Sequence, residues 1–202
     1  MKKSTLFVSA ALACVLGLSG CSSNDDGDLQ IPVSLSGVTK AGLTISNKGG
    51  APVAVAPGTQ FVFPDLVPLD SDYDIAIVDR PPNTDSCVVN NGKGNTGSYT
   101  PQNIVIVCVV TTYNLGGTIS GTRTAPVVIN NGAQSVTIPV DATTFTMSTP
   151  TAANPRLGQV PQDVPYGLTI LKQPAPGTCT IANPNGIMPA GPVNNIVITC
   201  TP

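Results

Sequence analysis

The hexapeptide NIVIVC at residues 103–108 returns, with a single substitution, as NIVITC at residues 195–200. In both copies Ile, Ile and Cys fall on every second position of a run rich in β-branched residues. This period of two is typical of a β-strand with one buried face. The repetition predicts that the chain folds as two copies of one β unit, each ending with this strand.

The similarity between the two halves extends well beyond the closing strand. LSGVTKAGLTISNKGG (35–50) aligns with ISGTRTAPVVINNGAQ (119–134), and the extra length of the second half falls in one proline-rich stretch, residues 148–165. Loops tolerate such insertions, whereas a strand that slipped by one residue would turn its apolar face to solvent. We therefore predict two domains, residues 31–110 and 111–202.

The composition indicates short strands joined by many turns. The 202 residues include 20 Gly and 20 Pro but only 4% aromatic residues, and the alternating apolar runs suggest about seven strands per copy. We therefore predict an all-β fold of two tandem immunoglobulin-like β-sandwich domains. Only the architecture is immunoglobulin-like, because the chain has no Trp and its cysteines are too close in sequence to link two sheets. Tyr73 and Tyr166 align, and we expect each in the core or at a corner of its domain, not as a ligand platform.

Four of the six cysteines lie in the repeats, where they could pair in three ways. The spacing between Cys87 and Cys108 equals that between Cys179 and Cys200, and each pair brackets a turn between two strand-like runs. Because an antiparallel hairpin brings its ends together, we predict one disulfide in each domain. Closing about 22 residues contributes roughly 3 kcal/mol. A four-cysteine metal site and a redox-active disulfide are the alternatives, but no C-x-x-C pair occurs.

The first segment, MKKSTLFVSAALACVLGLSGC, is typical of a secretory leader, with two lysines, an apolar run and small residues at its end. Its last four residues, LSGC, resemble the lipobox of bacterial lipoproteins. The resemblance implies a signal peptide over residues 1–20, acylation of Cys21, and a flexible tether over residues 21–30. It also implies a lipid-anchored protein of the bacterial cell envelope, with Ser22 favouring the outer membrane, on its periplasmic or surface side. The alternative is an ordinary signal peptide with Cys21 in a loop.

The side-chain inventory disfavours catalysis and nucleic-acid binding. The chain has no His, and neither G-x-S-x-G nor S-x-x-K occurs after the leader, so the usual catalytic bases and activated nucleophiles are missing. We expect no enzymatic activity and no cofactor. A formal net charge of −2 without clusters of Lys or Arg argues against binding to phosphate backbones.

One acidic cluster could hold a cation. Four aspartates crowd the stretch DLVPLDSDYD (65–74), and carboxylates are ligands that Ca²⁺ prefers. The candidate ligands are Asp70, Asp72 and Asp74, with Asp65 nearby. An EF-hand loop would need Gly where Ile75 stands and Glu where Pro81 stands, and the second repeat lacks the cluster. Two readings stay open: a weak calcium site, or the solvated face of a strand.

Four stretches of the chain form a characteristic combination: TTYNLGGTISG, VVINNG, YGLTILKQPAPGTCTIANPNG and NIVITC. Together they resemble the tandem repeats of many uncharacterised proteobacterial lipoproteins and secreted surface proteins, over residues 31–202. The first copy departs by lacking the Tyr-x-x-Gly-Gly opening. The resemblance implies a membrane-anchored, non-catalytic lipoprotein that acts as a structural, stalk or protein-interaction module, with an envelope or surface protein as partner. The alternative is a ligand-binding lipoprotein with a concave apolar site at the repeat junction, near residues 111–113 and the 148–165 loop.

Overall fold

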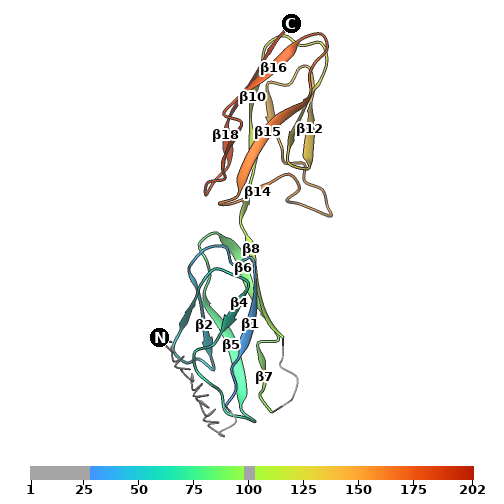
Figure 1. Ribbon diagram of the computed structural model, residues 1–202. Coiled ribbons are helices and arrows are strands. Elements are labelled where there is room, and N and C mark those ends of the chain that lie inside the picture. The colour runs from blue at the N-terminus through green and yellow to red at the C-terminus, as the bar shows by residue number, and fades with distance from the viewer. Residues whose placement is uncertain (1–27, 98–102) are drawn as a thin grey trace, which may run out of the picture.

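The computed structural model describes residues 28–97 and 103–202, and in these residues it contains eighteen β-strands and no helix. The predicted all-β class is confirmed. Figure 1 shows the strands gathered in two sandwiches that lie end to end, the first below and the second above. The predicted signal peptide and Cys21 lie outside the described residues. No helix in the described part of the chain is long and apolar enough to cross a membrane.

The first sandwich consists of two four-stranded sheets. Its strands are β1 (Pro32–Ser36), β2 (Leu43–Asn47), β3 (Val53–Val55), β4 (Gln60–Val62), β5 (Asp72–Asp79), β6 (Thr84–Asn90), β7 (Lys93–Asn95) and β8 (Ile104–Val110). One sheet has the order β4-β1-β8-β6, and the other has the order β3-β2-β5-β7.

The second sandwich repeats this arrangement. Its strands are β10 (Leu115–Ser120), β11 (Val127–Asn131), β12 (Gln134–Ile138), β13 (Thr144–Thr146), β15 (Pro165–Lys172), β16 (Thr178–Ala182), β17 (Asn185–Ile187) and β18 (Val193–Thr201). The sheet orders are β13-β10-β18-β16 and β12-β11-β15-β17, so every strand has a counterpart in the first sandwich. Each sandwich has eight strands, one more than the alternation suggested, because the short strands β7 and β17 pair with β5 and β15.

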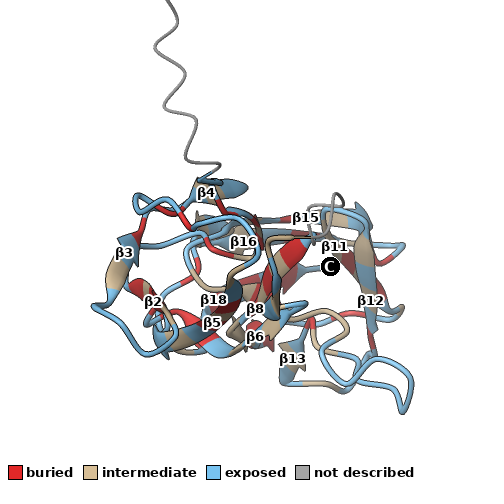
Figure 2. Ribbon diagram, turned by 90° about the horizontal axis from the view of Figure 1, so that it is seen from below, coloured by how far each residue is buried: buried red, intermediate tan, exposed pale blue. Residues whose placement is uncertain are grey.

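The strands that carry NIVIVC and NIVITC lie in the middle of their sheets. β8 runs parallel to β1 and antiparallel to β6, and β18 is placed in the same way between β10 and β16. A strand with a neighbour on each side and a core beneath it buries one whole face. Ile104, Ile106 and Cys108 are therefore buried, as are their counterparts in β18. In Figure 2 buried residues lie on the inner parts of the strands, and the surrounding loops are exposed.

Each sandwich has its own hydrophobic core, and the two clusters share no residue. Aligned positions of the two repeats occupy equivalent places in the cores, since Phe63 is buried in the first core and Met147 in the second. Tyr73 is buried as expected, whereas Tyr166 is half-buried and packs against the edge of the second core. The predicted core positions are thus occupied in both copies, with one tyrosine nearer to solvent.

Both tyrosines cover a glycine on the neighbouring strand. Tyr73 lies opposite Gly94, and Tyr166 lies opposite Gly186. A Cβ atom added to either glycine would meet the phenol ring of its tyrosine. The absence of a side chain at these two glycines lets the ring lie flat over the backbone, a cross-strand pair that restores packing where the strand itself has none.

Two further glycines hold the first and last strands together. Gly37 follows β1 and Gly121 follows β10, with φ angles of +74° and +92°. A Cβ at these positions would collide with the carbonyl oxygens of Cys108 and Cys200, respectively. Only glycine therefore allows the chain to turn away here while the closing strand passes at close range.

The two predicted disulfides are present. Cys87 faces Cys108 across β6 and β8, and Cys179 faces Cys200 across β16 and β18. The Cα atoms of each pair are 4.0 Å apart. Each bond joins two neighbouring strands of one sheet, β6 with β8 or β16 with β18, and does not link the two sheets. The pairs are not simple hairpins, because β7 or β17 of the other sheet lies between them in the chain.

Candidate functional site at the junction of the sandwiches

The sandwiches are joined by a short segment, residues 111–114, whose backbone is bonded on both sides. The N–H of Thr111 donates to the carbonyl of Asn83 in the first sandwich, and the carbonyl of Thr111 accepts from the N–H of Gln162 in the second, both at 2.9 Å. The carbonyl of Asn114 accepts from the N–H of Val193 at 3.0 Å. Because these bonds restrict the backbone torsions, the connection is stiffer than a free linker of equal length.

The proline-rich insertion, residues 148–165, folds back onto this connection. Its strand β14 (Val160–Pro161) pairs antiparallel with β9 (Thr112–Tyr113). The hydroxyl of Thr112 is bonded to the side-chain oxygen of Gln159, and the amide of Gln159 donates to Oδ1 of Asn114 at 3.1 Å. The equivalent loop of the first sandwich, residues 64–71, is much shorter. The insertion therefore belongs to the junction.

Arg156 of the insertion reaches into the first sandwich. Its Nη2 lies 2.6 Å from Oδ2 of Asp85 on β6, and its Nη1 donates to the carbonyl of Val110 at 3.3 Å. The hydroxyl of Thr111 donates to the other carboxylate oxygen of Asp85 at 2.7 Å. This hydrogen bond, followed by the bond and charge of Arg156 and the charge of Arg80, holds the pKa of Asp85 below its usual range, although partial burial opposes the shift.

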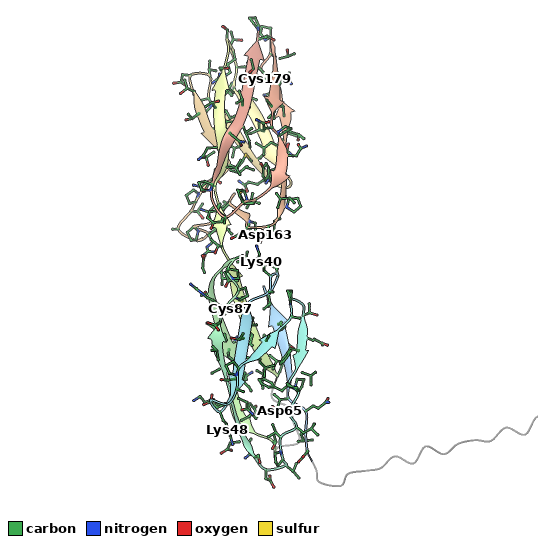
Figure 3. The ribbon with its side chains drawn as sticks, turned by 90° about the vertical axis from the view of Figure 1, so that its left-hand side faces the viewer. Lys40, Lys48, Asp65, Cys87, Asp163 and Cys179 are labelled. Carbon is green, nitrogen blue, oxygen red and sulfur yellow. A yellow bond between two sulfur atoms is a disulfide. The ribbon has the colours of Figure 1, made fainter. Side chains whose placement is uncertain are left out.

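Asp163, at the end of the insertion, makes a second bridge to the first sandwich. Its Oδ2 lies 3.2 Å from Nζ of Lys40 and 3.5 Å from Nδ2 of Asn83. Asn83 is fully buried and also donates to the hydroxyl of Thr39 at 3.0 Å. Figure 3 shows Lys40 and Asp163 facing each other where the sandwiches meet. The residues come from three segments that are distant in sequence.

These bridges are individually weak. The side chains of Arg156 and Asp85 are 41% and 39% exposed, and those of Lys40 and Asp163 are both 46% exposed. An exposed ion pair contributes about 0–1 kcal/mol because water and salt screen it. Together they restrict the relative orientation of the sandwiches. The two bridges and the β9–β14 pair act on the same connection, so a rotation of one sandwich would have to break several contacts at once.

The sequence predicts an apolar ligand site formed by residues 111–113 and the 148–165 loop, and the structure does place these two segments side by side. The groups that meet there are charged or amide side chains and backbone amides, bonded to one another. Arg156 and Asp163 were missed as junction residues. The signal was present, because they are the only charged residues of the insertion.

A shallow hollow of about 760 Å³ lies at the other end of the first sandwich, where Figure 3 labels Lys48. Lys48, Asp72, Tyr73, Asp74, Lys93, Gly94 and Asn95 line it. Both carboxylates in its lining are already engaged, because Asp74 lies 2.9 Å from Lys93, and Asp72 accepts from the amide of Asn95 at 2.8 Å. Burial raises the pKa of Tyr73, whose hydroxyl faces no partner among the described residues.

The aspartates proposed as calcium ligands share this end of the molecule. Asp72 and Asp74 are engaged as just described, while Asp65 and Asp70 are exposed. Within residues 28–97 and 103–202, no group of three or more His, Cys, Asp or Glu side chains is placed to hold a metal ion. Asp70, Asp72 and Asp74 are therefore not gathered around one point in the structure.

No protein-family model matches the chain, and no curated protein matches it in sequence. Among solved structures, a single B repeat unit of the collagen-binding surface protein of Staphylococcus aureus is 12% identical with a TM-score of 0.28, over 86% of this chain and 98% of that one. The major pilin T-13 of Streptococcus pyogenes is 12% identical with a TM-score of 0.27, over 87% and 99%. The shaft pilin SpaA of Lactobacillus rhamnosus GG, as its D295N mutant, is 13% identical with a TM-score of 0.26, over 86% and 97%. With these values, none of the three supports an inference about this chain's function.

Proposed function

We propose that this chain is a non-catalytic lipoprotein of the bacterial cell envelope, held at the outer membrane by an acylated Cys21. Its two sandwiches would act as a short, stiff stalk or interaction module that carries a contact surface for an envelope or surface protein away from the bilayer. The observation that carries this proposal is the braced junction. A stalk must keep its units in line, and the 148–165 insertion bonds to the first sandwich through Arg156 and Asp163.

The chemistry of the chain supports a structural role. Two side chains have a shifted pKa: burial raises that of Tyr73, and the hydrogen bond from Thr111 with the pairing to Arg156 lowers that of Asp85. Both shifts come from contacts that hold the fold or the junction together. One disulfide in each sandwich joins two strands of a sheet, and such bonds persist outside the reducing cytosol. Disulfides that stabilise the fold suit a structural protein of the cell envelope.

The stiffness of the junction is tested by measuring the relative orientation of the sandwiches in solution. Residual dipolar couplings of the native chain should fit one alignment tensor for both sandwiches. In the double variant Arg156→Ala with Asp163→Ala, each sandwich should require its own tensor, because both side-chain bridges are gone. The matched control is Asp141→Ala with Lys172→Ala, which removes the same charges from exposed positions on the second sandwich and should leave one tensor.

Two results would count against the stalk. Independent orientation of the sandwiches in the native chain would contradict a braced junction, and a single tensor in the double variant would show that the two bridges are not the brace. The anchor is tested separately by intact mass, which should show acyl chains on Cys21. Crosslinking in the native envelope, with identification of the neighbours by mass spectrometry, tests the protein partner.

A further inference from the structure

Large apolar side chains are exposed at the end of the first sandwich where the described chain begins. Leu66 and Leu69 are 52% and 54% exposed, Val62 is 45% exposed and Leu29 is 40% exposed. Leu66 and Leu69 belong to the loop between β4 and β5, residues 64–71, which we call the base loop. Exposed apolar side chains that gather on one end of a small domain indicate a contact surface.

The base loop is held in place by its backbone. Val67 is buried and exchanges two hydrogen bonds with Leu29, at 2.7 and 2.9 Å. The hydroxyl of Thr96 donates to the carbonyl of Pro68 at 2.6 Å, and the amide of Asn95 donates to the carbonyl of Asp70 at 3.2 Å. With the backbone bonded in this way, the loop presents Leu66 and Leu69 outward in a defined conformation.

In the second sandwich the equivalent loop is the 148–165 insertion, which contacts the first sandwich, the part of the chain that precedes it. The base loop likewise contacts the chain that enters its own sandwich, because Val67 is paired with Leu29.

Covalent geometry limits how far the base loop can be from an anchor at Cys21. The eight residue-to-residue steps from Cys21 to Leu29 span at most about 28 Å when fully extended. Leu29 is itself bonded to the base loop. An acylated Cys21 would therefore hold Leu29 within about 28 Å of its anchor, so Leu66 and Leu69 can reach the bilayer surface, where apolar side chains gain free energy by leaving water.

We propose that the base loop is a lipid-contact surface, on which Leu66 and Leu69 dip into the bilayer that holds the acyl chains of Cys21 and so set the stalk upright. The proposal rests on the lipid anchor of the proposed function. The contact is apolar, because Asp65 and Asp70 flank the two leucines and would be repelled by anionic headgroups. Zwitterionic lipid is therefore the surface it fits.

The chain has no Trp, so one introduced Trp is a unique fluorescent reporter. The acylated full-length protein with Leu69→Trp is placed in vesicles of phosphatidylcholine whose acyl chains carry bromine. We expect a blue shift of the emission and a loss of intensity by bromine quenching. The matched control is Leu171→Trp, a leucine on β15 of the second sandwich that is 65% exposed, and it should show neither change. Adding Leu66→Asp to Leu69→Trp should reduce the quenching.

The outcomes separate the loop from the anchor. Vesicle-bound, acylated protein in which Leu69→Trp is quenched no more than Leu171→Trp would overturn the lipid contact and leave the anchor standing. Protein that lacks acyl mass and does not float with vesicles would overturn the anchor, and with it the contact. A blue shift without vesicles that grows with protein concentration in a Cys21→Ser variant would assign the surface to self-association instead.

Discussion

The loop between the fourth and fifth strands is short and exposes two leucines in the first sandwich, whereas in the second it is long and carries charged side chains. In the first it exposes Leu66 and Leu69. In the second it carries Arg156 and Asp163 to the surface of the neighbouring sandwich. The strands around both loops keep the same order and register. The repeat therefore preserves the frame and varies the loop that meets the preceding part of the chain.

The opposite ends of the sandwiches differ as well. In the second sandwich the nearly buried guanidinium of Arg123 donates to the carbonyls of Pro139 and Ala142. Thr39 stands at the aligned position of the first sandwich and accepts from Asn83 at 3.0 Å. This end of the first sandwich faces the junction and contributes the small polar side chain of Thr39 to it. The corresponding end of the second sandwich is instead held by the Arg123 side chain, which binds the loop that contains Pro139 and Ala142.

The largest expected effect tests whether the two sandwiches depend equally on their disulfides for stability. Replacing both cysteines of one disulfide, Cys87→Ala with Cys108→Ala or Cys179→Ala with Cys200→Ala, should lower the free energy of unfolding of that sandwich by about 3 kcal/mol. Calorimetry should show one transition moving and the other staying in place. If both transitions moved together, the sandwiches would be one cooperative unit and the comparison would fail.

The closing glycines should give the next largest effect, equal in the two copies. Gly37→Ala and Gly121→Ala force a side chain into the closing strand at positive φ, and we expect a loss of about 2–3 kcal/mol in denaturant unfolding. Gly49→Ala and Gly132→Ala are the controls, because these glycines also have positive φ but no atom near the added Cβ. Their loss should be about 1 kcal/mol. Equal losses at all four sites would mean that the backbone shifts enough to remove the collision with the carbonyl oxygens of Cys108 and Cys200.

The ion pair of Arg156 with Asp85 should contribute less, and its contribution should depend on pH. Because the pKa of folded Asp85 is lowered, the stabilisation is fully present above the unfolded aspartate value of about 3.9 and is lost as the pH falls through the lower folded value. A double-mutant cycle of Arg156→Ala and Asp85→Asn at neutral pH should give a coupling of about 0.5 kcal/mol. The coupling should vanish in strong acid, and a coupling that persisted there would contradict the assignment.

The smallest effect distinguishes the two tyrosines. Tyr73 buries a hydroxyl that has no partner among the described residues, so Tyr73→Phe should raise the free energy of unfolding by about 0.5 kcal/mol. Tyr166 is nearer to solvent, and Tyr166→Phe should change nothing. Thermal unfolding of both variants checks this. A clear loss in Tyr73→Phe would mean that its hydroxyl has a partner in solution.

Much of the strand arrangement was predictable, because the alternation of apolar residues recurs at aligned positions of the two copies. The buried faces of β8 and β18 and both disulfides followed from alternation and from spacing. The partners of Tyr73 and Gly37 did not, because cross-strand contacts with Gly94 and Cys108 depend on register between strands that are distant in sequence. The short strands β7 and β17 were missed because their sequences, KGN and NGI, contain no alternating apolar residues and are typical of turns.

The sequence by itself determined the all-β class, the two copies of one unit and the pairing of the four cysteines, because each depends on local periodicity and on a repeat that leaves few alternatives. Only the tertiary structure decided that the closing strand lies in the middle of its sheet, beside the first strand. It also decided what the insertion does. Arg156 and Asp163 became junction residues only when folding brought Asp85 and Lys40 within hydrogen-bonding distance, across gaps in sequence that no periodicity spans.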